Sequence, residues 1–94
     1  MPYILPQCRP SLKLAAGAAV SALTDCGNNP EFDSGELNFL ISTIVWSLFE
    51  RQKNYATGSA LRGVLHDVDA EFYRRKMAPY EDTKIASNAD LETL

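Results

Sequence analysis

The sequence contains few of the side chains that carry most enzyme chemistry. Among 94 residues there is a single histidine, His66, and there are two cysteines, Cys8 and Cys26. The cysteines lie far apart and form no Cys-x-x-Cys motif, so we expect no zinc site and interpret both as free thiols. The glycine-rich phosphate loop GxxxxGK[ST] is also missing. These absences predict a protein that is not an enzyme and that needs neither a metal nor another cofactor.

Long apolar runs and an excess of positive charge are missing as well. No run approaches the ~20 apolar residues that cross a bilayer. The opening residues MPYILPQCRP lack the basic region of a signal peptide, so we expect a cytosolic protein. The formal net charge of −3 gives no general attraction to nucleic acid or to anionic lipid. The composition therefore disfavours nucleic acid and membranes as partners.

What the sequence does have is apolar side chains at helical spacing. With 46% hydrophobic residues in 94, one helical domain over residues 1–94 is expected. The apolar pattern has the 3.6-residue period of a helix in three places, most closely in the second, and predicts helices over residues 10–26, 34–53 and 58–78. Asp33 and Glu36 have the spacing of a capping box at the start of the second helix. The pattern predicts an all-α fold, a small three-helix bundle.

Prolines determine what we expect at the two ends. Pro2, Pro6 and Pro10 disfavour a helix in the residues before them, so residues 1–9 are predicted to form an extended arm. Pro79 has no N–H, and its ring clashes with the preceding turn, so the third helix should end or kink near Ala78. A short terminal helix over residues 79–87 and a frayed tail over residues 88–94 complete the prediction.

Some apolar side chains exceed what a three-helix core can hide. Phe39 and Trp46 lie off the centre of the apolar face of the second helix, and Tyr3 and Ile4 lie in the arm. We predict that these four residues form the interface of a homo-oligomer. The alternative is that the arm and the first helix cover the second helix within one chain.

Cations and tyrosines gather near the C-terminal end. The guanidinium groups of Arg74 and Arg75 can form two-point hydrogen bonds with phosphate, and tyrosine rings can stack on a base. We therefore predict a ligand-binding site with the following residues: Tyr73, Arg74, Arg75, Tyr80 and Lys84. The alternatives are that the cations complement a helix dipole, or that they pair with Glu81 and Asp82.

Three segments of the sequence resemble a family of small uncharacterised proteins from phages and prophages. These are the opening MPYI, the segment GELNFLIS and the segment EFYRRKMAPYEDTKIASN. The most specific parts lie at Gly35 to Asn38 and at Tyr73 to Ile85. The segment Asn88-Ala89-Asp90 departs from the Asn-Gly-Asp that is typical of the family. The resemblance implies a viral context, and it implies no particular activity.

Together these features predict a non-enzymatic phage accessory or counter-defence protein in the host cytoplasm. We expect it to bind and sequester a small phosphorylated ligand, such as a cyclic nucleotide immune signal, as a homo-oligomer. The alternative is a viral interaction module that binds a host or phage protein through the same surface or through the Trp46 face. The two hypotheses differ in whether a small ligand stabilises the protein.

Overall fold

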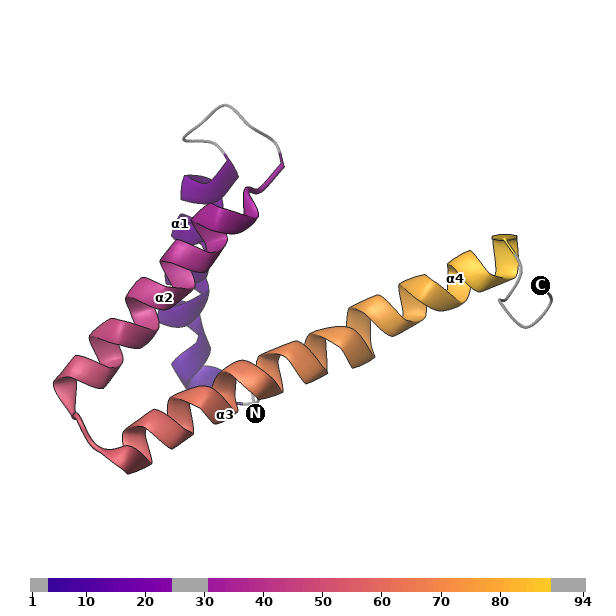
Figure 1. Cartoon of the computed structure of the whole chain (residues 1–94). Helices are drawn as coiled ribbons and strands as arrows, with labels where there is room; N and C mark the ends of the chain where they lie inside the picture. Colours follow the sequence, from indigo (N-terminus) through magenta and orange to yellow (C-terminus); the bar gives the residue numbers. More distant parts are fainter. Residues whose placement is uncertain (1–3, 25–30, 89–94) are drawn as a thin grey trace. The chain divides into compact units, whose positions relative to one another are not determined.

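The regular structure of the described residues is entirely helical. The computed structural model describes residues 4–24 and 31–88, and Figure 1 traces the elements. The all-α class predicted from the sequence is therefore confirmed for this part of the chain. In chain order the elements are a 3₁₀ turn, η1 (Pro6–Cys8), then α1 (Arg9–Thr24), α2 (Ser34–Arg51), α3 (Tyr55–Phe72), a π-helical turn, η2 (Tyr73–Met77), and α4 (Ala78–Asn88).

The contacts within the chain divide it into two units, which are described separately. The N-terminal unit is Pro2–Leu61, and the C-terminal unit contains Arg62–Leu94. The boundary falls inside α3, so this helix belongs to both. The predicted ends of the first helix and of the tail, residues 25–26 and 89–94, lie outside the described residues, as does Tyr3.

Asparagine and aspartate side chains start two of the helices. The Asp33 carboxylate accepts hydrogen bonds from the backbone N–H groups of Gly35 at 2.7 Å and Glu36 at 3.1 Å, as expected for the cap of α2. At α3 the Asn54 side chain accepts from the backbone N–H of Thr57 at 2.8 Å. Because Asn54 satisfies this otherwise unpaired donor, α3 begins at Tyr55 rather than at residue 58 as predicted.

The expected extended arm is folded back from Ile4 onward. The N–H of Cys8 donates to the carbonyl of Leu5 at 2.9 Å and closes η1. The Arg9 guanidinium donates to the carbonyl of Ile4 through Nε at 3.1 Å and Nη2 at 2.9 Å. Proline fixes its own φ at a value that a 3₁₀ turn accepts, so Pro6 can start this turn. The described part of the arm is thus attached to the beginning of α1.

Pro79 does not end the C-terminal helix, because a wider turn precedes it. In a regular α-helix the Pro79 ring would clash with the carbonyl of Arg75. Here the N–H of Ala78 donates to the carbonyl of Tyr73, five residues back, which makes Tyr73–Met77 a π turn. Pro79 then lies in the first turn of α4, a position that proline tolerates. The interruption predicted near Ala78 takes this form instead of a break in the helix.

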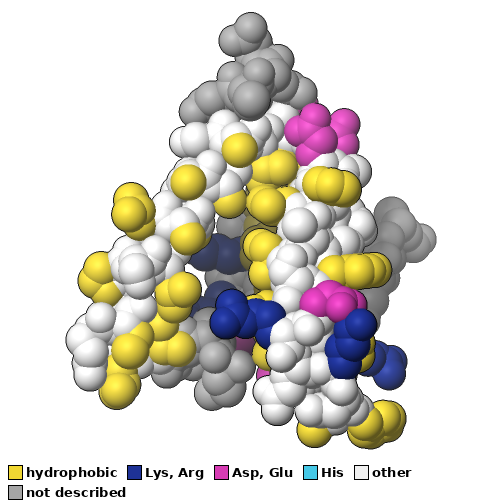
Figure 2. Space-filling model, turned by 90° about the vertical axis from the view of Figure 1, so that its left-hand side faces the viewer, with side chains coloured by type: hydrophobic (Ala, Val, Ile, Leu, Met, Phe, Trp, Pro, Cys, Tyr) yellow, Lys and Arg dark blue, Asp and Glu magenta, His cyan; other side chains and the backbone are white. Residues whose placement is uncertain are grey.

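Burial is partial wherever the structure describes the chain. The apolar period of the sequence puts seven residues on one face of α2. Leu37, Leu40, Val45 and Phe49 are half-buried, and Ile41, Ile44 and Leu48 are exposed. The Phe49 ring reaches the start of α3, since a Cβ added at Gly58 would lie 3.6 Å from its Cε1 atom. No side chain in the described ranges is fully buried. Figure 2 shows the result, with many hydrophobic side chains (yellow) at the surface.

Candidate functional site

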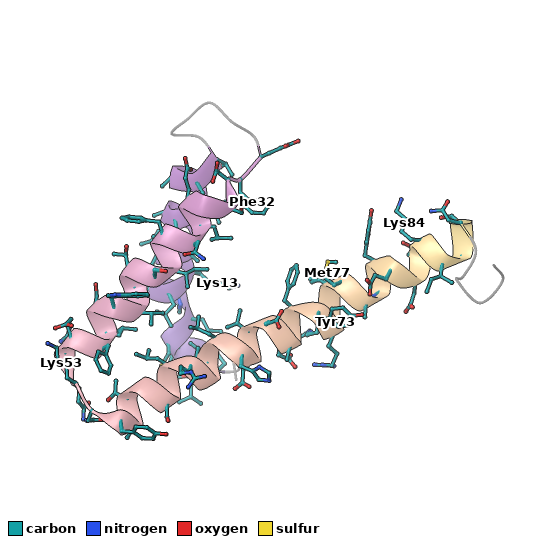
Figure 3. All side chains as sticks on the ribbon, in the orientation of Figure 1. Lys13, Phe32, Lys53, Tyr73, Met77 and Lys84 are labelled. Carbon is teal, nitrogen blue, oxygen red and sulfur yellow. The ribbon has the colours of Figure 1, made fainter. Side chains whose placement is uncertain are left out.

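The five predicted ligand residues all lie on the continuous helix of the C-terminal unit. Tyr73, Arg74 and Arg75 belong to the π turn, and Tyr80 and Lys84 lie about one turn apart on α4. The structure brings the last two together, because the Lys84 ammonium lies 5.5 Å from the centre of the Tyr80 ring. This distance is within the range of a cation–π interaction. Figure 3 labels Tyr73 and Lys84 on this segment.

Arg74 already binds an oxyanion. Its Nε and Nη2 atoms donate to the two carboxylate oxygens of Glu71 at 3.2 Å and 3.0 Å. Glu71 lies three residues before Arg74, a spacing at which helical side chains meet. The Arg74 side chain is 67% exposed, so water screens the pair and its contribution to stability is small. The guanidinium is therefore held in a geometry that suits any acceptor with two adjacent oxygens.

The Tyr73 side chain forms a hydrogen bond with an acidic residue of α4, Glu81. Its hydroxyl donates to Glu81 Oε1 at 2.7 Å. This hydrogen bond, with the nearby negative charge of Glu81, raises the pKa of Tyr73 above its ordinary value, and desolvation and Asp82 add to the effect. The phenol therefore remains a hydrogen-bond donor at neutral pH. Glu81, which the sequence suggested as a partner for the arginines, accepts from a tyrosine.

The spacing of Tyr73 and Glu81 explains why sequence reasoning missed this contact. The two residues are eight apart, and on a regular α-helix of 3.6 residues per turn they would be separated by about 80°. The π turn takes up an additional residue and removes most of this angle. The proline six residues after Tyr73 was the only local signal of an irregular turn.

Three of the four predicted interface residues lie in the described part of the N-terminal unit, and Tyr3 lies outside the described residues. Phe39 and Trp46 are 73% and 65% exposed on α2, and their spacing of seven residues puts them on one side of the helix. Ile4 is exposed, and its carbonyl binds Arg9. Within the described ranges, the two aromatic side chains are thus available for an external contact.

The described residues hold neither a metal cluster nor a membrane-spanning helix. These ranges contain no group of three or more histidine, cysteine, aspartate or glutamate residues that could hold a metal ion. None of their helices combines the length and the apolar composition that a membrane span requires. Cys8 is an exposed free thiol, and Cys26 lies outside the described residues.

Comparison with known proteins identifies a family. A family model described as "Domain of unknown function (DUF6899)" matches residues 1–91. The chain belongs to this family. A search of curated proteins gives no match, and a search of solved structures gives none either. The matched DUF6899 range includes all five predicted ligand residues, so the candidate site is part of the DUF6899 domain itself.

Proposed function

We propose that this protein is a non-enzymatic phage accessory protein that binds and sequesters a small phosphorylated ligand in the host cytoplasm. A cyclic nucleotide that serves as an immune signal is a ligand of this kind. The observation that supports the proposal is the two-point contact of Arg74 with a carboxylate. A phosphate group offers the same pair of adjacent acceptor oxygens to a guanidinium fork. The viral context comes from the sequence resemblance.

Phosphate must compete with Glu71 for Arg74, and displacing Glu71 costs little. An exposed ion pair contributes about 0–1 kcal/mol, so little is lost when Glu71 is displaced. A cyclic dinucleotide carries two phosphates and can also engage Arg75, one residue further along the π turn. When no ligand is present, the Glu71 carboxylate occupies the place of the phosphate and holds the Arg74 side chain in position.

Tyr80 and Lys84 supply the remaining chemistry of a nucleotide site. A base can stack on a tyrosine ring with little dependence on its identity, and the Lys84 ammonium beside that ring can bind a further phosphate. All of these groups lie on one helix with exposed side chains. A single helix cannot enclose a ligand, so sequestration requires a second surface, which a homo-oligomer provides.

A thermal-shift screen tests the proposal directly. The purified protein is heated with nucleotides and with cyclic di- and trinucleotides, and its molar mass is measured by light scattering on the same sample. A ligand present at a hundred times its dissociation constant stabilises the folded state by about 2.7 kcal/mol, which is easily detected for a domain of this size. We expect a shift with phosphorylated ligands and none with the matching nucleosides. No shift with any compound would contradict the proposal.

The exposed aromatics of α2 favour a second candidate function, the binding of a host or phage protein. Aromatic side chains are enriched among the residues that carry most interface energy. In a pull-down from infected cells we expect one dominant partner, which is lost with Trp46→Ala or Phe39→Ala. Tyr55→Ala is the matched control, because it removes an even more exposed aromatic side chain from the same unit. Equal loss of the partner in all three variants would contradict a role for the Trp46 face.

A further inference from the structure

The π turn changes which side chains share a face of the C-terminal helix. On a regular α-helix, Met77 would lie about 140° around from Phe72, because five residues exceed one turn. The hydrogen bond from the N–H of Ala78 to the carbonyl of Tyr73 closes a π turn, in which about five residues complete one turn of the helix. Met77, five residues after Phe72, therefore lies on the same side of the helix as Phe72. The apolar face of α3 therefore continues into α4. We call this face the C-terminal stripe, and its residues are Leu65, Val68, Phe72, Met77 and Tyr80.

The C-terminal stripe has no cover within its own unit. Its five side chains are between 38% and 60% exposed. Among the described residues of the C-terminal unit, only Glu71 and Ala78 are even half-buried. Figure 3 shows Met77 and Lys84 projecting from the same side, so the face extends along α4. Five apolar side chains in one line are typical of a helix that packs against another helix.

We propose that the C-terminal stripe pairs with the same stripe of a second copy, with the two helices antiparallel and Phe72 at the two-fold axis. The stripe is symmetric about this residue. Val68 lies about one turn before Phe72 and Met77 about one turn after it, while Leu65 and Tyr80 lie about two turns away. An antiparallel partner therefore places Val68 against Met77 and Leu65 against Tyr80, and every apolar residue meets another.

Charge selects the antiparallel direction. The charged residues on one flank of the stripe are Glu71, one residue before Phe72, and Lys76, one residue before Met77. An antiparallel copy lays its Glu71 beside Lys76 of the first chain, at two symmetry-related places. A parallel copy in register would set like charges against each other. Because the same chain carries both the acidic and the basic residue, the partner that matches this surface is a second copy of the chain.

Disulfide cross-linking tests the geometry without any ligand, so its outcome is separate from that of the proposed function. In a background with Cys8→Ser and Cys26→Ser, Val68→Cys and Met77→Cys are made in separate chains. We expect a disulfide-linked dimer when the two variants are mixed and almost none from either alone. Ala70→Cys, on the opposite side of the helix from Phe72, is the matched control and should not cross-link with any of them.

Two other results would overturn the pairing. If Val68→Cys cross-links to itself as well as it does to Met77→Cys, the helices are not antiparallel about Phe72. If the mixture gives no more dimer than Ala70→Cys and the unsubstituted protein has the mass of a monomer by light scattering, the stripes do not pair. Circular dichroism of each variant shows whether its helices are retained.

A charge reversal tests the direction of pairing independently. Glu71 and Lys76 each immediately precede a stripe residue, so they lie on the same flank, and a two-fold axis brings equal flanks together. Lys76→Glu should weaken the dimer about tenfold, because each of two symmetric places loses on the order of 0.7 kcal/mol. Glu71→Lys should weaken it similarly, and the combined variant should recover most of the affinity. Additive losses in the combined variant would contradict this contact.

Discussion

Alanine at both Arg74 and Arg75 should abolish the binding of a phosphorylated ligand while leaving the helices intact. A hydrogen bond to a charged group contributes about 1.5–3 kcal/mol, so removing both guanidinium groups should weaken binding by more than about a hundredfold. Folding should change little, because the Arg74 side chain of the ion pair with Glu71 is 67% exposed and water screens the pair. Calorimetric titration with the best ligand of the thermal-shift screen measures the affinity, and circular dichroism measures the helicity.

Arg62→Ala is the control for this loss, since it removes a cation from the same unit at a position outside the cluster. It should bind the ligand with nearly the affinity of the unsubstituted protein. Arg74→Lys adds a finer test, because lysine keeps the charge but loses the planar fork. Unchanged affinity in the double alanine variant would remove the π turn from the ligand site, even if the protein binds nucleotides elsewhere.

Replacing Gly17 and Gly63 together by alanine should raise the free energy of unfolding by about 2 kcal/mol. Each glycine lies inside a helix, where alanine is favoured by about 1 kcal/mol. A Cβ atom at either position would meet nothing within 4 Å in one chain. The two substitutions are far apart in sequence and share no partner, so their effects should add. Thermal unfolding followed by circular dichroism measures the change.

Gly35 provides the contrast. It also lies in a helix, but a Cβ there would be only 3.0 Å from the capping oxygen of Asp33, so alanine should bring no such gain. If alanine at Gly17 instead lowers stability in a concentration-dependent way, another chain approaches α1 at that point. The small residues around Gly17 would then be a helix contact rather than a tolerated defect.

Helix class and helix starts could be predicted well, because both depend on neighbours in sequence. The apolar period of α2 predicted a face of seven residues, and four of them, Leu37, Leu40, Val45 and Phe49, are half-buried. Asp33 caps this helix through bonds to residues two and three positions away. The start of α3 was less accurate because Asn54, Thr57 and Ser59 are all suitable caps. Only the structure shows which of them binds a backbone N–H.

The C-terminal segment was harder, because proline permits more than one response. A helix can end before Pro79 or widen by one residue, and the local sequence favours the first. The widened turn decides which side chains share a face, so the contact of Tyr73 with Glu81 could not be inferred from α-helical spacing. The prediction divided the five ligand residues between two helices, one before and one after Pro79, and their acidic partners emerged only from the structure.

The π turn also has a consequence for comparing the sequences of relatives. It is equivalent to one residue inserted into an α-helix. The additional residue widens the turn and so avoids the clash between the Pro79 ring and the carbonyl of Arg75. A DUF6899 relative with no proline at this place can keep the same apolar face with one residue fewer between Phe72 and Ala78. Alignments of the family should therefore allow a single-residue gap here and link it to the proline. An alignment without that gap would shift every α4 residue onto the wrong side of the helix.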